Sequence, residues 1–160
     1  MVEPVIAPPG PGIAFAVTGT PRPQPRPRFV RGRVISTANK HVLLWREAVT
    51  RAARQAMADA QAEPFVEPVS VDIVFTMPTR DSARWGLPHT FRPDKDNLEK
   101  LVLDCMVKAR ALRDDSLVAA GRTVKLWGEV GGVRVVARRM GSNWQQEART
   151  ATKHGLDRLG

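Results

Sequence analysis

The sequence holds a single cysteine, Cys105, in 160 residues. One thiol excludes an internal disulfide and a zinc site built from several cysteines. No apolar run is long enough to span a bilayer, and the opening MVEPVIAPPGPG lacks the basic region and apolar block of a secretory signal. Internal repeats are absent as well. These absences predict a cytoplasmic protein, outside any membrane, that folds by burying its own core.

Acidic residues are also few relative to basic ones. The chain has 25 Lys plus Arg against 16 Asp plus Glu, which gives a formal net charge of +9. Such a surplus attracts polyanions, nucleic acid above all. The alternative is a basic surface that is merely solvated. Of the two, the charge favours a nucleic-acid partner.

Apolar patterning predicts one α+β domain over residues 13–140, in which a small mixed β-sheet packs with two main helices. Residues 1–12 are rich in Pro and Gly and are expected to be a disordered tail. Residues 141–160 are expected to be a C-terminal tail with a short helix. Residues 79–92 lack a period and predict a long loop, which is usually functional or mobile.

The individual elements follow from spacing and punctuation. Strands are expected at 13–19, 69–78, 118–127 and 131–140, and a hairpin at 29–37 that turns near Gly32. A first helix is expected from about Asn39 to Ala60 with Thr37 as its N-cap. A second is expected from an Asp96 or Asn97 cap to about Arg110.

Acids gather in the stretch FRPDKDNLEK, residues 91–100. Pro93 favours extended geometry, so Asp94-Lys95-Asp96 is expected to be extended, with the two carboxylates on one side. A hard divalent cation relieves the repulsion between such neighbours. Lys100 follows Asp96 by one helical turn. The alternative is an ordinary helix cap followed by a surface ion pair.

More acids follow the same helix. Asp104 lies one turn beyond Lys100, and Asp114 and Asp115 come after the helix, where they can fold back beside its start. Adjacent residues on an extended segment point to opposite sides, so spacing alone does not choose between Asp114 and Asp115. An ordinary turn is the alternative for this pair.

The run RPDKDNLEKLVLDCMVKARALRDDSLV closely resembles the RusA family of endodeoxyribonucleases, which are Holliday junction resolvases common in phages and prophages. That family shows a Pro-Asp-x-Asp-Asn-Leu-x-Lys run, an Asp within the helix, and Asp-Asp before a strand. The upstream GTPRPQPRPRFV and STANKHVLLWREAV resemble its opening. The resemblance covers about residues 14–140.

The resemblance implies a role for each matching residue. Asp94, Asp96 and Asp115 would be metal-binding catalytic carboxylates, and Lys100 the catalytic lysine, while Asp104 matches a recurrent position of unassigned role. Carboxylate ligands suit magnesium, with manganese as a substitute. The lysine ammonium would stabilise developing negative charge or orient the attacking water.

The function implied is a magnesium-dependent, structure-selective endodeoxyribonuclease. It would resolve Holliday junctions by paired phosphodiester cleavage, in DNA recombination and repair, as a homodimer that matches the two-fold symmetry of a four-way junction. Two alternatives stay open. One is a non-enzymatic basic DNA-binding protein, and the other is a metal nuclease that acts on flaps or forks.

Basic residues cluster in and after the Pro-rich segment 20–28. We expect them to contact DNA phosphates, which positions the DNA without reading its sequence. The alternative is that they keep a Pro-rich edge soluble and unpaired. The expected DNA-binding residues are Arg22, Arg26, Arg28, Arg31 and Arg33.

Four other side chains need an interpretation. Trp45 and Cys105 follow the apolar stripes of the two helices and are expected in the core. His89 is expected to be a bystander in its loop. Trp85 either inserts at a junction crossover or packs over the site.

Overall fold

A mixed five-stranded sheet forms the centre of the molecule, which the computed structural model describes over residues 12–141 and at Trp144. Strand β4 (Val69–Pro78) runs through the middle. β7 (Gly132–Arg139) pairs antiparallel with β4 and with β1 (Gly12–Thr18). On the other edge of β4, two strands pair with it in parallel, β5 (Val118–Ala120) and β6 (Thr123–Gly128). The predicted mixed sheet is therefore confirmed.

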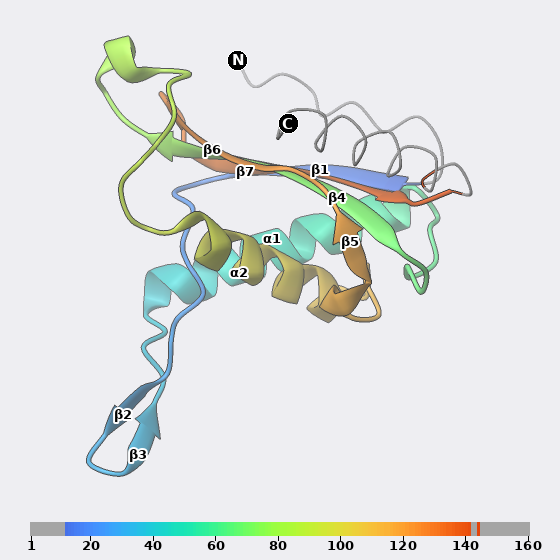
Figure 1. Cartoon of the computed structure of the whole chain (residues 1–160), viewed down its shortest axis with the longest axis horizontal. Helices are drawn as coiled ribbons and strands as arrows, with labels where there is room; N and C mark the ends of the chain where they lie inside the picture. Colours follow the sequence, from blue (N-terminus) through green and yellow to red (C-terminus); the bar gives the residue numbers. More distant parts are fainter. Residues whose placement is uncertain (1–11, 142–143, 145–160) are drawn as a thin grey trace, which may run out of the picture.

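Two helices cover one face of this sheet, α1 (Lys40–Asp59) and α2 (Lys95–Lys108) (Figure 1). Every second residue is buried along β4 and along β7 as far as Ala137, as expected when one face of a strand meets helices. The core between the layers joins the sheet to both helices and includes Phe75, Ile73, Val135, Val49, Leu98 and Leu101. The chain forms one α+β domain, as predicted.

Helix α1 begins close to where the sequence predicted, but its cap is a different residue. Asn39 is the N-cap, and its side chain accepts a hydrogen bond from the backbone N–H of Val42 at 3.0 Å. The prediction of Thr37 was wrong because the Thr37 hydroxyl has another partner. It donates to the carbonyl of Arg26 at 3.1 Å, and this bond joins the segments that enter and leave the hairpin.

The strand predicted over residues 118–127 is broken into β5 and β6. Gly121 lies between them with φ +141°, and a Cβ at this position would come within 1.9 Å of the Val71 carbonyl oxygen. The backbone of β4 is too close for a regular ladder here. The chain resumes pairing at Arg122, whose carbonyl accepts from the N–H of Ile73 at 2.9 Å. The N–H of Arg122 donates to the carboxylate of Asp72, also at 2.9 Å.

A two-stranded hairpin projects from the body of the domain (Figure 1). It consists of β2 (Arg28–Val30) and β3 (Arg33–Ile35), paired antiparallel as the sequence predicted. Arg31 (φ 49°) and Gly32 (φ 75°) form its turn, and two central residues with positive φ match the right-handed twist of a tight hairpin. Both strands are exposed along their length.

The predicted loop 79–92 has more order than its sequence suggested. It contains a short 3-10 helix, η1 (Ser82–Arg84), capped by the carboxylate of Asp81. It then runs along the free edge of β6, where Trp127 exchanges backbone hydrogen bonds with Gly86 and Leu87. The sheet edge thus fixes the path of the chain into α2.

Two predictions fall largely outside the described residues. These are the disordered tail at 1–12, of which only Gly12 is described, and the tail with a short helix at 141–160. Among the helices that the structure describes, none has both the length and the apolar character needed to cross a membrane.

Candidate active site at the start of helix α2

Helix α2 starts earlier than predicted. Asp94 is its N-cap, with extended backbone angles (φ −68°, ψ 144°), and Lys95 is already helical. The predicted cap at Asp96 or Asn97 and the predicted extended run 94–96 are both wrong. The extended geometry that Pro93 favours ends at Asp94. The helix starts there because the N–H of Leu98 bonds back to the Asp94 carbonyl at 3.2 Å and because Leu98 is buried.

The chain just before Asp94 is fastened to the sheet by Lys125 of β6. Its Nζ donates to the carbonyls of Phe91 and Pro93, both at 2.7 Å. Partial burial lowers the pKa of Lys125, and the nearby charge of Asp94 acts in the opposite direction. Sequence reasoning missed this residue, although a lone charge inside an apolar strand pattern was an available signal.

Asn97, in the first turn of α2, attaches the Pro- and Arg-rich segment to the same place. Its carbonyl accepts from the N–H of Gln24 at 3.0 Å, and its side-chain oxygen accepts from the Arg26 guanidinium at 3.2 Å. Gln24 in turn accepts from Arg46 of α1 at 2.7 Å. The basic segment therefore lies beside the acidic helix start.

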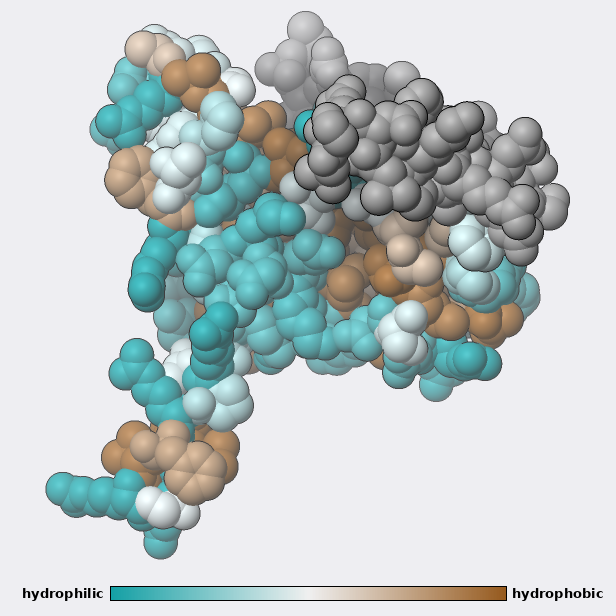
Figure 2. Space-filling view, in the orientation of Figure 1, coloured by the Kyte–Doolittle hydropathy of each residue, from teal (hydrophilic) through white to brown (hydrophobic). Residues whose placement is uncertain are grey.

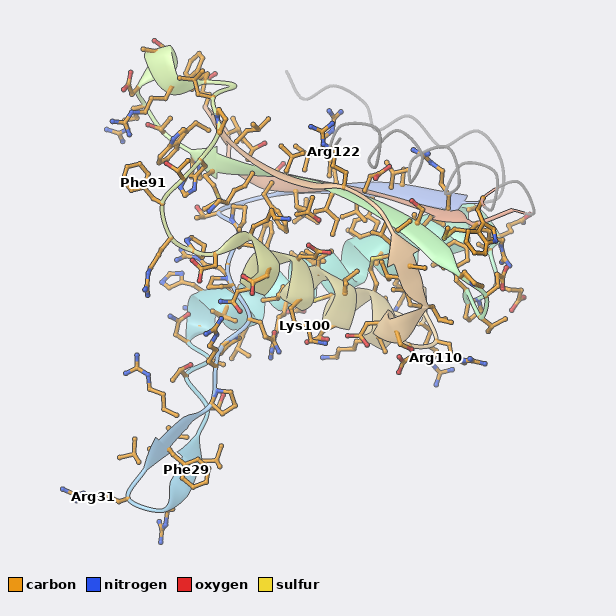
Figure 3. All side chains as sticks on the ribbon, in the orientation of Figure 1. Phe29, Arg31, Phe91, Lys100, Arg110 and Arg122 are labelled. Atoms are coloured by element: carbon orange, nitrogen blue, oxygen red, sulfur yellow. The ribbon has the colours of Figure 1, made fainter. Side chains whose placement is uncertain are left out.

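Lys100 belongs to α2 (Figure 3), and its ammonium contacts two carboxylates. Its Nζ is 2.8 Å from Asp104 and 2.5 Å from Asp115. These hydrogen bonds, that of Asp104 first, raise the pKa of Lys100 above its ordinary value. Both contacts favour the ammonium form of this lysine, which suits it to stabilise negative charge.

Asp114 and Asp115 take different directions. Asp115 begins the short helix η2 (Asp115–Leu117) and turns back to Lys100. Asp114 caps η2 by accepting from the N–H of Ser116 at 2.9 Å, and this bond lowers its pKa. The spacing of the sequence left the two open, and the structure brings Asp115 to the side of α2.

Asp94 and Asp96 have unengaged carboxylates. Both are exposed, and neither forms a side-chain hydrogen bond or ion pair within the part of the chain that the structure describes. Carboxylate oxygens are the donors that magnesium and similar hard cations prefer. Over residues 12–141, however, no three ligating side chains lie close enough together to hold a metal ion. The donor chemistry fits a divalent cation, while Asp115 is paired with Lys100.

A hollow of about 430 Å³ opens beside Asp94. Arg22 and Arg92 line it, together with Asp94 and Asn97. Two cationic side chains and a carboxylate in one lining are suited to a phosphate brought close to a cation. Of the predicted DNA-binding residues, Arg22 and Arg26 lie near the site, and Arg28, Arg31 and Arg33 lie on the projecting hairpin.

The other four side chains singled out in the sequence pack within the domain or within their own loop. Trp45 and Cys105 are buried in the core, as expected. His89 is buried against Trp127, with ring centroids 4.1 Å apart, and burial lowers its pKa. Trp85 is partly exposed and donates to the Thr79 carbonyl at 3.0 Å, which holds it within its own loop.

Fold and site together define a basic α+β domain with exposed carboxylates and a fixed ammonium beside an arginine-rich segment. Residues 18–138 match the sequence profile of the family described as Endodeoxyribonuclease RusA. Since this match spans most of the chain, the protein belongs to the RusA family of endodeoxyribonucleases.

No match to a curated protein is found. Membership indicates a hydrolase that cleaves phosphodiester bonds within DNA, and the family suggests action on Holliday junctions. Nucleases of this kind generally depend on a divalent metal.

Proposed function

We propose that this protein is a magnesium-dependent endodeoxyribonuclease that resolves Holliday junctions by paired cleavage, as a homodimer, in DNA recombination and repair. One observation carries the proposal. Within the RusA match, exposed Asp94 and Asp96 begin the helix on which Lys100 is paired with Asp115.

Asp94, Asp96 and Asp115 would hold the cation, with manganese as a substitute for magnesium. Asp115 uses Oδ2 for Lys100, which leaves Oδ1 as a ligand. When bound, the metal supplies positive charge that polarises the phosphodiester and stabilises the leaving oxygen. The Lys100 ammonium stabilises charge on the phosphate or orients the attacking water. Lys125 keeps the approach to Asp94 in place.

The arginine-bearing segment supports a DNA substrate. Arg22 and Arg26 lie beside the helix start, so a phosphate at the acids is within the same basic surface. Such contacts orient the DNA without selecting its sequence. Two sites related by a two-fold axis would match the symmetry of a four-way junction, and a homodimer provides them.

A substrate panel tests the proposal. Four-way junction, flap, fork and linear duplex of matched arm sequence are incubated with magnesium, with manganese and with EDTA. A cruciform plasmid distinguishes paired cleavage, which gives a linear product, from single cleavage, which gives a nicked circle. We expect fast junction cleavage with either metal, none with EDTA, and mainly linear plasmid.

Other outcomes point to the alternatives. Equal cleavage of flaps or forks would make the protein a general branched-DNA nuclease. Binding without cleavage of any substrate, in either metal, would make it a non-enzymatic DNA-binding protein. Sedimentation at assay concentration checks the homodimer, and a monomer that yields linear plasmid would remove the dimer from the proposal.

A further inference from the structure

The projecting hairpin has one apolar face that nothing in the described chain covers. Phe29 pairs directly with Val34 across the strands, so both side chains lie on the same face. Phe29 is 78% exposed and Val34 61% exposed. Figure 2 shows this apolar surface on the arm, away from the body of the domain. An exposed aromatic face of this kind marks a binding surface.

The charge around this face indicates what binds it. On the opposite face, the cross-strand pairs are Arg28 with Ile35 and Val30 with Arg33. Arg31 lies at the tip (Figure 3). No Asp or Glu occurs between Glu3 and Glu47. A second copy of this basic chain would meet the arm with like charge, whereas a polyanion complements it.

The arm is also connected to the candidate active site. Its base is closed by the hydrogen bond from Thr37 to the Arg26 carbonyl, and the Arg26 side chain bonds to Asn97 of α2. DNA bound at Asp94 and Asp96 would therefore lie next to the hairpin.

Duplex DNA offers phosphates to arginines but hides the apolar faces of its bases, because they are stacked. Base faces become accessible at a branch point, where stacking is interrupted. Apolar side chains of DNA-bending proteins insert between base steps at the cost of unstacking them, and aromatic rings stack on unpaired bases. At a branch point that cost is lower. An exposed ring on a hairpin that also carries arginines thus distinguishes branched from linear DNA, which the arginines alone do not.

We propose that the Phe29–Val34 face is a base-stacking surface that inserts at the branch point and gives the protein its preference for branched DNA. This inference rests on the proposed function. It assigns branch selectivity to the hairpin and leaves cleavage to the acids of α2.

The test measures binding without cleavage, with EDTA and in an Asp96→Asn background. The probes are a four-way junction with 2-aminopurine at the crossover and a duplex of equal length. The variants are Phe29→Ala, Phe29→Trp, and Val30→Ala as the control on the opposite face. Circular dichroism and sedimentation check that each variant is folded and in the same oligomeric state.

We expect Phe29→Ala to lower the junction-to-duplex affinity ratio about tenfold, within the range for loss of one base–aromatic stack. It should also abolish the 2-aminopurine signal and leave duplex affinity unchanged. Phe29→Trp should retain both readouts, and Val30→Ala should match the parent.

A Phe29→Ala protein that keeps its ratio while the parent prefers junctions would overturn this inference alone. Loss of the homodimer in Phe29→Ala would also overturn it, because the face would then join two copies. A parent without junction preference would instead contradict the proposed function.

Discussion

The start of α2 and the β2–β3 hairpin lie at the same end of the molecule, but they are held in opposite ways. The helix start is acidic, and several hydrogen bonds from Lys125, Gln24 and Arg26 fix the backbone around it. The hairpin is basic and exposed on both faces, and over residues 12–141 its two strands pair only with each other.

The difference matches what each region is proposed to do. Chemistry at a phosphate requires groups placed to within a fraction of an ångström. The backbone at the helix start is accordingly hydrogen-bonded to the sheet. Contact with DNA of variable shape requires charge and apolar surface that reach outward. Substitutions at the helix start should therefore change the rate of cleavage, and substitutions on the hairpin should change binding.

The largest effect should come from Asp96→Asn. We expect cleavage of a four-way junction to fall about 1,000-fold or more, because a carboxylate that holds the metal contributes several kcal/mol at the transition state. Junction affinity in EDTA should stay unchanged, because the basic surface is intact. Single-turnover cleavage and gel-shift titration measure the two quantities.

Asp59→Asn, at the far end of α1, is the matched control and should cleave like the parent. A variant at position 96 that cuts at near the parental rate would remove Asp96 from the site.

The next effect should come from Lys125→Met. It removes the donor to the carbonyls of Phe91 and Pro93, so Asp94 loses its fixed position. We expect cleavage to fall about 10- to 100-fold, as for other groups that orient metal ligands. Junction affinity should stay unchanged.

Lys108→Met, at the exposed end of α2, is the control for loss of one lysine charge. If both variants lose the same amount of binding and neither loses cleavage rate, Lys125 acts only as a surface charge.

Lys125 also shows where sequence reasoning stopped. The helices and the main strands were predictable because their apolar periods are regular and buried. The hairpin, whose strands are exposed, was predictable from the glycine at its turn. The break at Gly121 was not, because it depends on how closely the backbone of β4 approaches. The lone charge of Lys125 within an apolar strand was a signal in the sequence, but the loop carbonyls to which it donates are brought to it by the tertiary structure and were not predictable.

The candidate site was predictable in part for a similar reason. The spacing of Asp96, Lys100 and Asp104 by four residues predicted one helix face, and Lys100 and Asp104 do form an ion pair. The geometry of Lys95 and Asp96 was mispredicted as extended, because the extended backbone ends at Asp94. The tertiary bond that fastens the chain at Pro93 allows the helix to begin at once.

A smaller effect concerns the hairpin and salt. Log junction affinity should fall linearly with log salt, since bound arginines release counterions from the DNA. Replacing Arg28, Arg31 and Arg33 together by Gln should make the slope shallower by about 2.7, at about 0.9 for each phosphate that is no longer neutralised. Fluorescence anisotropy at several salt concentrations measures it.

The control replaces Arg110 and Arg122 by Gln. These arginines lie away from the hairpin (Figure 3), so the slope should stay unchanged. Equal slopes for the hairpin variant and the parent would mean that the arm does not contact phosphates.

The smallest effect should be on stability, in Asp94→Asn. Asp94 caps α2 without a side-chain hydrogen bond and lies near the charge of Lys125, so its negative charge stabilises the helix start only weakly. A loss of about 0.3–1 kcal/mol predicts a metal-free melting temperature lower by about 1–3 °C. Magnesium at the proposed site would bind only the folded state, so it should raise the melting temperature of the parent and raise that of Asp94→Asn less. Asp59→Asn should respond to magnesium like the parent. Melting curves with EDTA and with millimolar magnesium decide the matter: an Asp94→Asn protein that gains as much from magnesium as the parent would show that this carboxylate is a helix cap and not a metal ligand.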